Sequence, residues 1–202
     1  QRSTEAALKY FLLGAFASAF LLFGIALLYG ATGTTLIPMM QYVLQMYGQY
    51  VSPYLLMGGL SLVLVGMAFK AGVVPFHMWV PDVYEGAPTA VTAFMSAAPK
   101  AAALAVVMRI FAGELNMLAR NWVDVFLVLG VLTMTLGNLV AVAQDNMKRM
   151  LAYSGIAYIG YLFAGIAAFN GNSASSVLYY LAVYTFMNMG AFAVVAMLNR
   201  RG

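Results

Sequence analysis

The stretch FKAGVVPFHMWVPDVYEGAPTAVTAFMSAAPK, residues 69–100, places a lysine near each of its ends, and its flanks are almost entirely apolar. Lys70 ends an apolar run that begins near Tyr54, and Lys100 lies inside the apolar run Thr89–Gly113. An ammonium group near the centre of a membrane-spanning helix costs about 2.5–3.5 kcal/mol on insertion scales. If these runs cross a membrane, that cost favours a functional role for both lysines.

The composition indicates that they do cross one. Hydrophobic residues make up 64% of the 202 residues and charged residues 8%, whereas about a quarter of residues are charged in ordinary soluble domains. The chain has no cysteine and one histidine, which excludes a thiolate-held cluster and argues against a self-contained haem or zinc site. We therefore expect no cofactor in this chain. The net charge of +4 is scattered, so we expect a lipid bilayer as partner and no nucleic acid.

Six apolar stretches reach the length of about 20 residues that a helical span needs. None alternates apolar and polar residues as a membrane barrel strand does. We predict an all-α membrane protein, a polytopic bundle of about six transmembrane helices, with a short surface helix in the uncharged segment 30–53. The predicted spans are Ala6–Tyr29, Tyr54–Phe76, Thr89–Gly113, Trp122–Ala143, Met150–Phe169 and Ser176–Leu198.

Positive charges in the loops predict the orientation, because Lys and Arg concentrate on the cytoplasmic side of a membrane. The side opposite to Arg120 and the nearby Arg109 carries the larger group of basic residues. We therefore expect the first helix to run outward and both ends of the chain to face the cytoplasm. The larger group consists of Arg2, Lys148, Arg149, Arg200 and Arg201.

Glycine and proline predict helix breaks beside both lysines. Lys100 lies about 12 residues, or about 18 Å, into its predicted span, and the preceding Pro99 removes a backbone donor. Gly72 and Pro75 follow Lys70, and a break there would let the chain continue within the membrane and leave Lys70 deep. Interrupted helices line wet cavities in transporters. We predict helix breaks at all three of these glycine and proline positions.

Several charged residues also have a structural interpretation. Lys70, considered alone, can be a lysine near the end of a span whose ammonium group reaches the membrane–water interface. Glu5 and Lys9 stand four residues apart in the order that favours an ion pair on one helix face, and an interfacial pair with no further role fits that spacing. His77 can carry protons near neutral pH, or it can be satisfied by a loop carbonyl.

Two acids lie close to a predicted turn. Asp82 and Glu85 stand in the stretch PDVYEGAP, directly before Gly86 and Pro88. Asp side chains commonly hydrogen-bond the backbone of turns. We expect these acids to stabilise the loop by capping the turn at 86–88.

Residues 69–100 resemble the signature region of subunit N of proton-translocating NADH:quinone oxidoreductase (respiratory complex I), an antiporter-like membrane subunit family. RSTEAALKYFLLGAFASAFLLFGIALLYG, residues 2–30, resembles the span before that region, and NLVAVAQDNMKRMLAYSGIAYIGYL, residues 138–162, the region after it. In the last span, members like subunit L carry histidines and a lysine. This chain has Tyr180, Tyr184 and Asn188 there, which is similar to subunit N.

The resemblance implies a central fragment of an antiporter-like fold with two inverted repeats, in which residues 1–113 and 122–199 belong to the first and second repeat. It implies a multi-pass protein of the bacterial inner (plasma) membrane that works as a proton-translocating subunit, or translocase, of the enzyme, with no redox centre of its own. Its implied partners are the other membrane subunits of complex I, both the sister antiporter-like subunits and the small membrane subunits.

The resemblance and the buried charges together suggest roles for individual residues. Lys70 is expected to hold the translocated proton, and Lys100 to relay it toward the centre of the bundle. Glu5 and Lys9 would form a modulating ion pair near the cytoplasmic side. His77 is a further candidate participant.

Three other functions fit parts of the sequence. A cation/proton antiporter subunit would need several convergent carboxylates or carbonyls, and the spans contain almost no acid. A structural membrane anchor would not depend on either lysine. A quinone-binding role finds little support in the Tyr and Met residues, which are normal in helix packing.

Overall fold

The structure is a computed structural model that describes residues 2–168 and 173–199. The described residues form helices and no strand. Six helices are long and apolar enough to cross a membrane, which confirms the predicted all-α bundle. In chain order the elements are α1 (Arg2–Thr32), α2 (Ile37–Tyr47), η1 (Gly48–Tyr50), α3 (Pro53–Ala71), α4 (Trp79–Gly86), α5 (Thr89–Val107), η2 (Met108–Glu114), η3 (Asn116–Leu118), α6 (Ala119–Val142), α7 (Met147–Ala167) and α8 (Ser173–Asn199).

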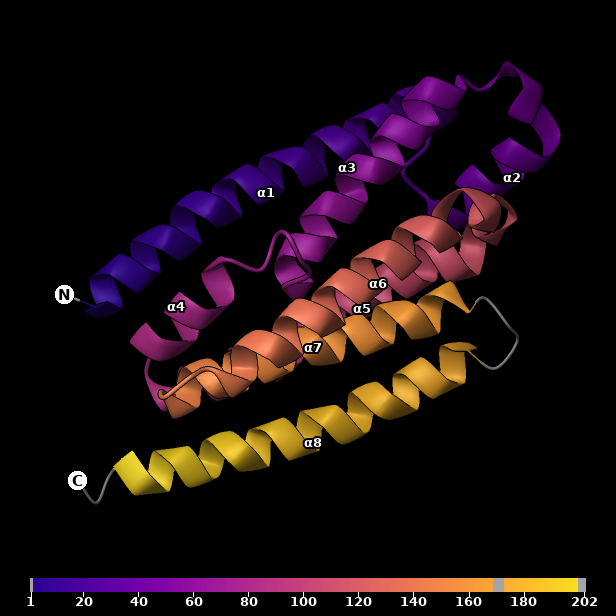
Figure 1. Ribbon diagram of the computed structural model, residues 1–202. Helices are drawn as coiled ribbons and strands as arrows, with labels where there is room; N and C mark the ends of the chain where they lie inside the picture. Colours follow the sequence, from indigo (N-terminus) through magenta and orange to yellow (C-terminus); the bar gives the residue numbers. More distant parts are fainter. Residues whose placement is uncertain (1, 169–172, 200–202) are drawn as a thin grey trace.

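The long helices lie roughly side by side and alternate in direction (Figure 1). The start of α1, the end of α4, the start of α7 and the end of α8 gather at one end of the bundle, and the short helix α2 lies at the opposite end. Arg2, Lys148 and Arg149 are therefore on one side, as the charge distribution predicted. Arg200 and Arg201 lie outside the described residues.

Glycines allow two pairs of these helices to approach closely. A Cβ added to Gly24 of α1 would lie 2.8 Å from the carbonyl oxygen of Gly59 in α3. One added to Gly137 of α6 would lie 2.6 Å from the backbone nitrogen of Ala157 in α7. Small residues at such contacts are the usual means of bringing helices together in lipid, where apolar burial provides no driving force.

The chain breaks between α3 and α4, at the place predicted from Gly72 and Pro75. Gly72 has a left-handed backbone with φ of 82° and ends α3, a conformation that glycine adopts without steric cost. The indole Nε1 of Trp79 donates to the Phe69 carbonyl at 2.9 Å, and the Val74 amide donates to Thr133 Oγ1 at 3.1 Å. Backbone groups released by the break thus find partners, as a buried break requires.

Two details of the prediction are wrong. The second span was expected to reach Phe76, but α3 ends at Ala71 because the left-handed Gly72 stops it earlier. Pro99 was expected to break its helix, but α5 continues through it from Thr89 to Val107. A proline within a helix removes one hydrogen bond, and the helix persists where another donor replaces the missing amide. The irregular part of this segment is η2, a π-helix.

Replacing Gly137 with valine should destabilise the α6–α7 pair. The added carbons would meet the backbone of Ala157, which cannot move aside as a side chain can, and overpacking of this kind costs about 1–3 kcal/mol. Thermal unfolding of the full-length subunit in detergent would measure the loss. Gly30→Val is the control, because no atom lies within 4 Å of a Cβ at Gly30. Equal melting temperatures for the two variants would contradict the packing role.

Candidate functional site

Lys100 of α5 is the buried charge of this bundle, with a solvent-exposed fraction of 0%. Its Nζ donates to the carbonyl oxygen of Gly155 in α7 at 3.2 Å. The same nitrogen lies 5.6 Å from the centre of the Tyr84 ring, within the range of a cation–π contact. Within residues 2–168 and 173–199, no carboxylate forms an ion pair with it. A buried ammonium with one carbonyl partner has donors left for a mobile acceptor such as water.

Pro99 shapes the surroundings of Lys100 because it has no backbone N–H and so leaves one carbonyl of α5 without its helical donor. In an uninterrupted helix the amide of residue 99 would donate to the carbonyl of Met95. The hydroxyl of Tyr84 donates to that carbonyl instead, at 3.3 Å. This bond holds the Tyr84 side chain of α4 against α5, and its ring faces Lys100. The proline was correctly singled out in the sequence, but it positions a neighbour and does not end the helix.

Lys70 lies in a different environment from Lys100. It belongs to the last turn of α3, and its side chain is exposed on the surface of the described residues. It lines a cavity of about 360 Å³ between α1 and α3, together with Tyr10, Gly14 and Ser18 among others. No hydrogen bond or ion pair joins Lys70 to Lys100 in the described part of the chain. The depth of Lys70 in a membrane stays a prediction.

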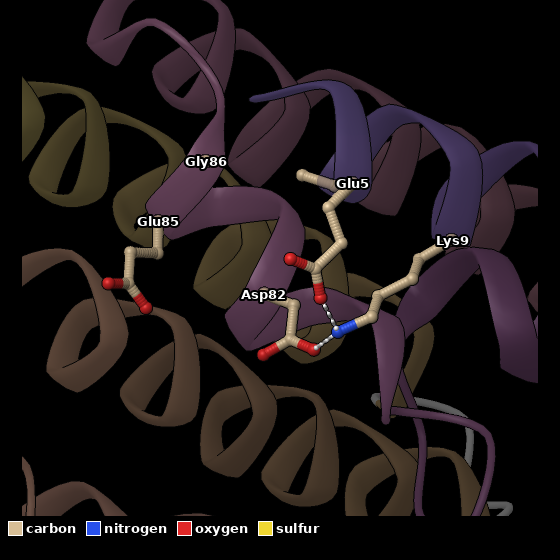
Figure 2. A pocket seen from close by; sticks show the side chains of 6 residues that line it. Glu5, Lys9, Asp82, Glu85 and Gly86 are labelled. Atoms are coloured by element: carbon tan, nitrogen blue, oxygen red, sulfur yellow. Dashed lines mark hydrogen bonds and ion pairs between the residues drawn. The ribbon is translucent and has the colours of Figure 1, made fainter. Parts of the chain in front are cut away.

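Charged side chains from three helices form a network at the end of the bundle where α1 begins. Lys9 Nζ lies 2.8 Å from a carboxylate oxygen of Glu5 and 2.8 Å from one of Asp82 (Figure 2). Arg149 of α7 binds the other oxygen of Asp82 at 2.9 Å and a carboxylate oxygen of Glu85 at 3.1 Å. The network therefore joins α1, α4 and α7 through the two acids of α4.

This network confirms one sequence prediction and corrects another. The Glu5–Lys9 ion pair is present, as the spacing of four residues indicated. Asp82 and Glu85 were expected to stabilise the neighbouring turn, but they bind basic residues of other helices. Spacing along the chain cannot reveal these contacts, since Lys9 and Asp82 are 73 residues apart. The site also includes a cavity of about 200 Å³ lined by Glu5, Ala6, Lys9, Asp82, Glu85 and Gly86.

The two basic partners change the acidity of Asp82, which lies in α4 and outside the six candidate spans. The hydrogen bond from Lys9 is the main cause that lowers the pKa of Asp82 below its ordinary value of 3.8. Arg149 acts in the same direction, whereas partial burial opposes it. The carboxylate is thus held ionised by its neighbours.

His77 lies in the break between α3 and α4 and is half-buried. No hydrogen bond joins it to Lys70 or to Lys100 among the described residues. The described part of the chain also holds no group of three His, Cys, Asp or Glu side chains placed to bind a metal ion.

Of the three residues around Lys100, sequence reasoning did not single out two. Tyr84 and Gly155 carry no motif that marks them, and their importance follows only from tertiary contact. Tyr184 was noted as one of three polar positions on the last span, spaced one helical turn apart. That spacing is a usable signal, because residues four apart share a helix face, and Tyr184 is 2% exposed.

Comparison with known proteins places the whole chain in one family. Residues 1–202 match the family described as "NADH:quinone oxidoreductase/Mrp antiporter, TM". The chain is similar to NADH-quinone oxidoreductase subunit N of Moorella thermoacetica, with 52% identity over 202 residues, covering 100% of this chain and 42% of the relative. It is also similar to NADH-quinone oxidoreductase subunit N of Trichlorobacter lovleyi, with 49% identity over 201 residues, covering 100% of this chain and 41% of the relative. The chain thus spans less than half the length of these curated relatives.

Solved structures of three membrane complexes contain the same fold. In respiratory complex I from Thermus thermophilus with bound aureothin, one chain is similar to this one with 43% identity and a TM-score of 0.75, over 95% of this chain and 40% of that one. A chain of the Mrp complex from Dietzia is similar to this one with 29% identity and a TM-score of 0.86, over 96% of this chain and 35% of that one. A chain of the archaeal membrane-bound sulfane sulfur reductase is similar with 28% identity and a TM-score of 0.83, over 97% of this chain and 40% of that one.

Replacing Asp82 with asparagine should destabilise the protein by about 1 kcal/mol at neutral pH, because it removes the charge that joins Lys9 to Arg149, and each partly exposed ion pair contributes up to about that much. Since the folded-state pKa of Asp82 is lowered, the contribution is fully present above the ordinary pKa of 3.8 and disappears as the pH falls further. Thermal unfolding of both proteins at neutral pH and below pH 4 would show the difference shrinking.

Asp124→Asn is the matched control for this measurement. Asp124 lies on α6, is exposed, and forms no ion pair with any described residue. We expect its removal to leave the unfolding temperature unchanged throughout the pH range. If the Asp82→Asn protein is as stable as the wild type at neutral pH, the network does not stabilise the fold.

Proposed function

This chain belongs to the NADH:quinone oxidoreductase/Mrp antiporter transmembrane family, and on that basis we propose that it is part of a subunit that carries protons across a bacterial inner membrane. In this proposal the subunit works in the membrane arm of an NADH:quinone oxidoreductase, beside sister antiporter-like subunits and small membrane subunits. NADH oxidation and quinone reduction take place elsewhere in the complex. The chain itself acts as a translocase without a redox centre.

The observation that carries the proposal is the burial of Lys100. This ammonium group, at 0% exposure, has one carbonyl as its hydrogen-bond partner among the described residues, and the Tyr84 ring lies beside it. Burial disfavours the charged form of a lysine, and a nearby negative charge favours it. A group held in this way changes its protonation when a neighbouring charge moves. Moving one proton against 100 mV costs about 2.3 kcal/mol, so the free energy of protonating Lys100 has to change by about that amount in each cycle.

Lys70 is the second lysine of the proposed proton path. It stands beside the break between α3 and α4 and lines the cavity shared with α1. We assign it the role of holding a proton at the broken helix, with His77 as a further participant in the break. Lys100 then relays the proton toward the second repeat. The two inverted repeats correspond to residues 1–113 and 122–199.

Glu5 and Lys9 are assigned a modulating role in the same scheme. Their pair extends through Asp82 to Arg149, and the cavity that they line opens at the end of the bundle where α1 begins. In the orientation predicted by the positive residues, that end faces the cytoplasm. A change in the charge of this network would alter the electrostatic potential along the path to the lysines.

A second candidate function is cation/proton exchange, which the likeness to a chain of the Mrp complex favours. Coordination of a sodium or potassium ion needs several convergent oxygen ligands. The acids that converge among the described residues, Glu5, Asp82 and Glu85, are engaged with Lys9 and Arg149, which favours protons over metal cations. A structural anchor is the remaining alternative, and it requires neither lysine.

Replacing Lys100 with alanine in the full-length subunit should abolish most proton pumping by the assembled complex, because the chain then lacks its buried titratable amine. Lys100→Arg should be defective as well, since arginine retains the charge but does not release its proton at physiological pH. Lys70→Ala should also reduce pumping. Proton uptake by inverted membrane vesicles, measured beside NADH oxidation and the amount of assembled complex, would test all three.

Arg120→Ala is the control, because it removes an exposed positive charge outside the site. We expect normal pumping from this variant. Normal pumping in both Lys100→Ala and Lys70→Ala would instead identify the chain as a structural anchor. Pumping that depends on added sodium or potassium ions would favour cation exchange.

A further inference from the structure

Gly155 lies where α5, α7 and α8 meet, and its missing side chain leaves room for two polar groups. A Cβ added to Gly155 would lie 2.8 Å from the hydroxyl oxygen of Tyr184 and 3.0 Å from Nζ of Lys100. Both atoms therefore border the same small space, one from α8 and the other from α5. No direct hydrogen bond joins the two groups among the described residues, but these two distances place them close enough for one bridging water, or for a direct bond after a small side-chain movement.

We propose that the Tyr184 hydroxyl is the proton-exchange partner of Lys100 and that Gly155 is a positioning residue that keeps the two groups together. This inference rests on the proposed role of Lys100 in proton movement. It adds the group that receives the proton from Lys100, and this group lies on α8, in the proposed second repeat.

The hydrogen bonds of Tyr184 suit this role. Asn188, one turn further along α8, donates its Nδ2 to the Tyr184 oxygen at 3.0 Å. The hydroxyl hydrogen is therefore free to point toward another acceptor, since a tyrosine hydroxyl donates one bond and accepts others. Tyr184 and Asn188 are 2% and 5% exposed, so both polar side chains lie inside the bundle.

The pair can form a hydrogen bond in either protonation state of Lys100. The ammonium form donates an N–H to the Tyr184 oxygen, and the neutral amine accepts the hydroxyl hydrogen. During transfer, an N–H bond of the ammonium breaks as a bond to the Tyr184 oxygen forms. The original O–H bond breaks at the same time and passes its proton to a water molecule beyond. Charge is conserved, and Lys100 becomes neutral while that water becomes hydronium.

The surroundings of Gly155 distinguish this role from ordinary helix packing. A Cβ at Gly160, on the same helix, would meet the backbone of Met134 and Gly130 in α6, and a Cβ at Gly165 would meet the side chain of Val177. Those glycines permit close helix contact. At Gly155 the two nearest atoms are the polar ends of Lys100 and Tyr184, so the space serves those groups.

The other groups around Lys100 do not offer a competing proton partner. From α4 it meets the ring of Tyr84, whose hydroxyl is engaged with the Met95 carbonyl. From α7 it meets the carbonyl of Gly155, which accepts a hydrogen bond but does not exchange protons. No described Asp, Glu, Arg or His side chain forms an ion pair or hydrogen bond with it. Tyr184 of α8 is thus the titratable hydroxyl open to Lys100.

The test uses the full-length subunit in the assembled complex. Tyr184→Phe removes the hydroxyl and keeps the ring, and we expect proton pumping to fall about tenfold, the factor that corresponds to losing one hydrogen bond to a charged group. The pH profile of pumping should change as well, since the neutral form of Lys100 loses its donor. Tyr180→Phe is the matched control, because Tyr180 lies one turn away on α8 and packs on Tyr158 without facing Lys100.

Gly155→Ala forms the second arm. Its added methyl group would displace Nζ and the hydroxyl, and we expect pumping to fall while the complex still assembles. Gly165→Ala crowds the same helix against Val177, and it should pump normally. Both control variants should also retain the wild-type pH profile.

The outcomes separate this inference from the proposed function. If Lys100→Ala stops pumping but Tyr184→Phe pumps normally at every pH, the relay assignment fails and the role of Lys100 stands. A Tyr184→Phe subunit that does not assemble would assign the hydroxyl to folding and would equally overturn the relay. Pumping that survives in Lys100→Ala would refute the proposed function itself.

Discussion

The buried ammonium group of Lys100 is the constraint on which the arrangement of the bundle depends. A charged amine has three hydrogens to donate, and leaving them without partners in a medium of low polarity is costly. Four helices contribute to its surroundings: α5 carries the lysine, α7 provides the Gly155 carbonyl, α4 the Tyr84 ring, and α8 the Tyr184 side chain. Helices far apart in the sequence must therefore meet at one side chain.

The wider fold does not by itself select the transported ion. The same helix arrangement occurs in complexes whose names refer to a quinone-linked respiratory enzyme, to Mrp and to a sulfur reductase. Function therefore has to be argued from the residues within the fold. Here the distinguishing feature is the pairing of each acid in the Lys9 network with a basic residue, whereas Lys100 has no such counterion in the part of the chain that the structure describes. The charges of the network are thus neutralised by their neighbours, and the charge of Lys100 is not.

The local features of this protein were predictable from the sequence, because they depend on neighbouring residues. Hydrophobic runs predicted the six spans, and the glycine and proline after Lys70 predicted the break between α3 and α4. The contacts of Asp82 were not predictable, since its partners Lys9 and Arg149 are 73 and 67 residues away. The sequence also does not show which face of α3 its neighbours cover, and Lys70 lies on a face that the described residues leave exposed.

The Pro99 position shows most clearly why local rules fail at this site. Proline within a helix removes one backbone hydrogen bond, and on that ground alone a helix break is expected. In this bundle the Met95 carbonyl that loses its amide partner accepts the Tyr84 hydroxyl, so the helix continues and the tyrosine ring is brought to the lysine that follows the proline. The sequence shows the missing donor, but only the tertiary structure shows what replaces it.

The short helix α4 connects the two polar regions of the protein. Asp82 and Glu85, three residues apart on α4, bind Arg149, while Tyr84 between them meets Lys100. Because α4 is a helix of eight residues, it fixes the positions of the two acids relative to the Tyr84 ring. Most of its residues are buried, and Trp79 at its start donates to the Phe69 carbonyl of α3, so packing and the ion pairs hold the helix together. A substitution that displaces α4 from Arg149 would therefore also displace the Tyr84 ring from the ammonium group.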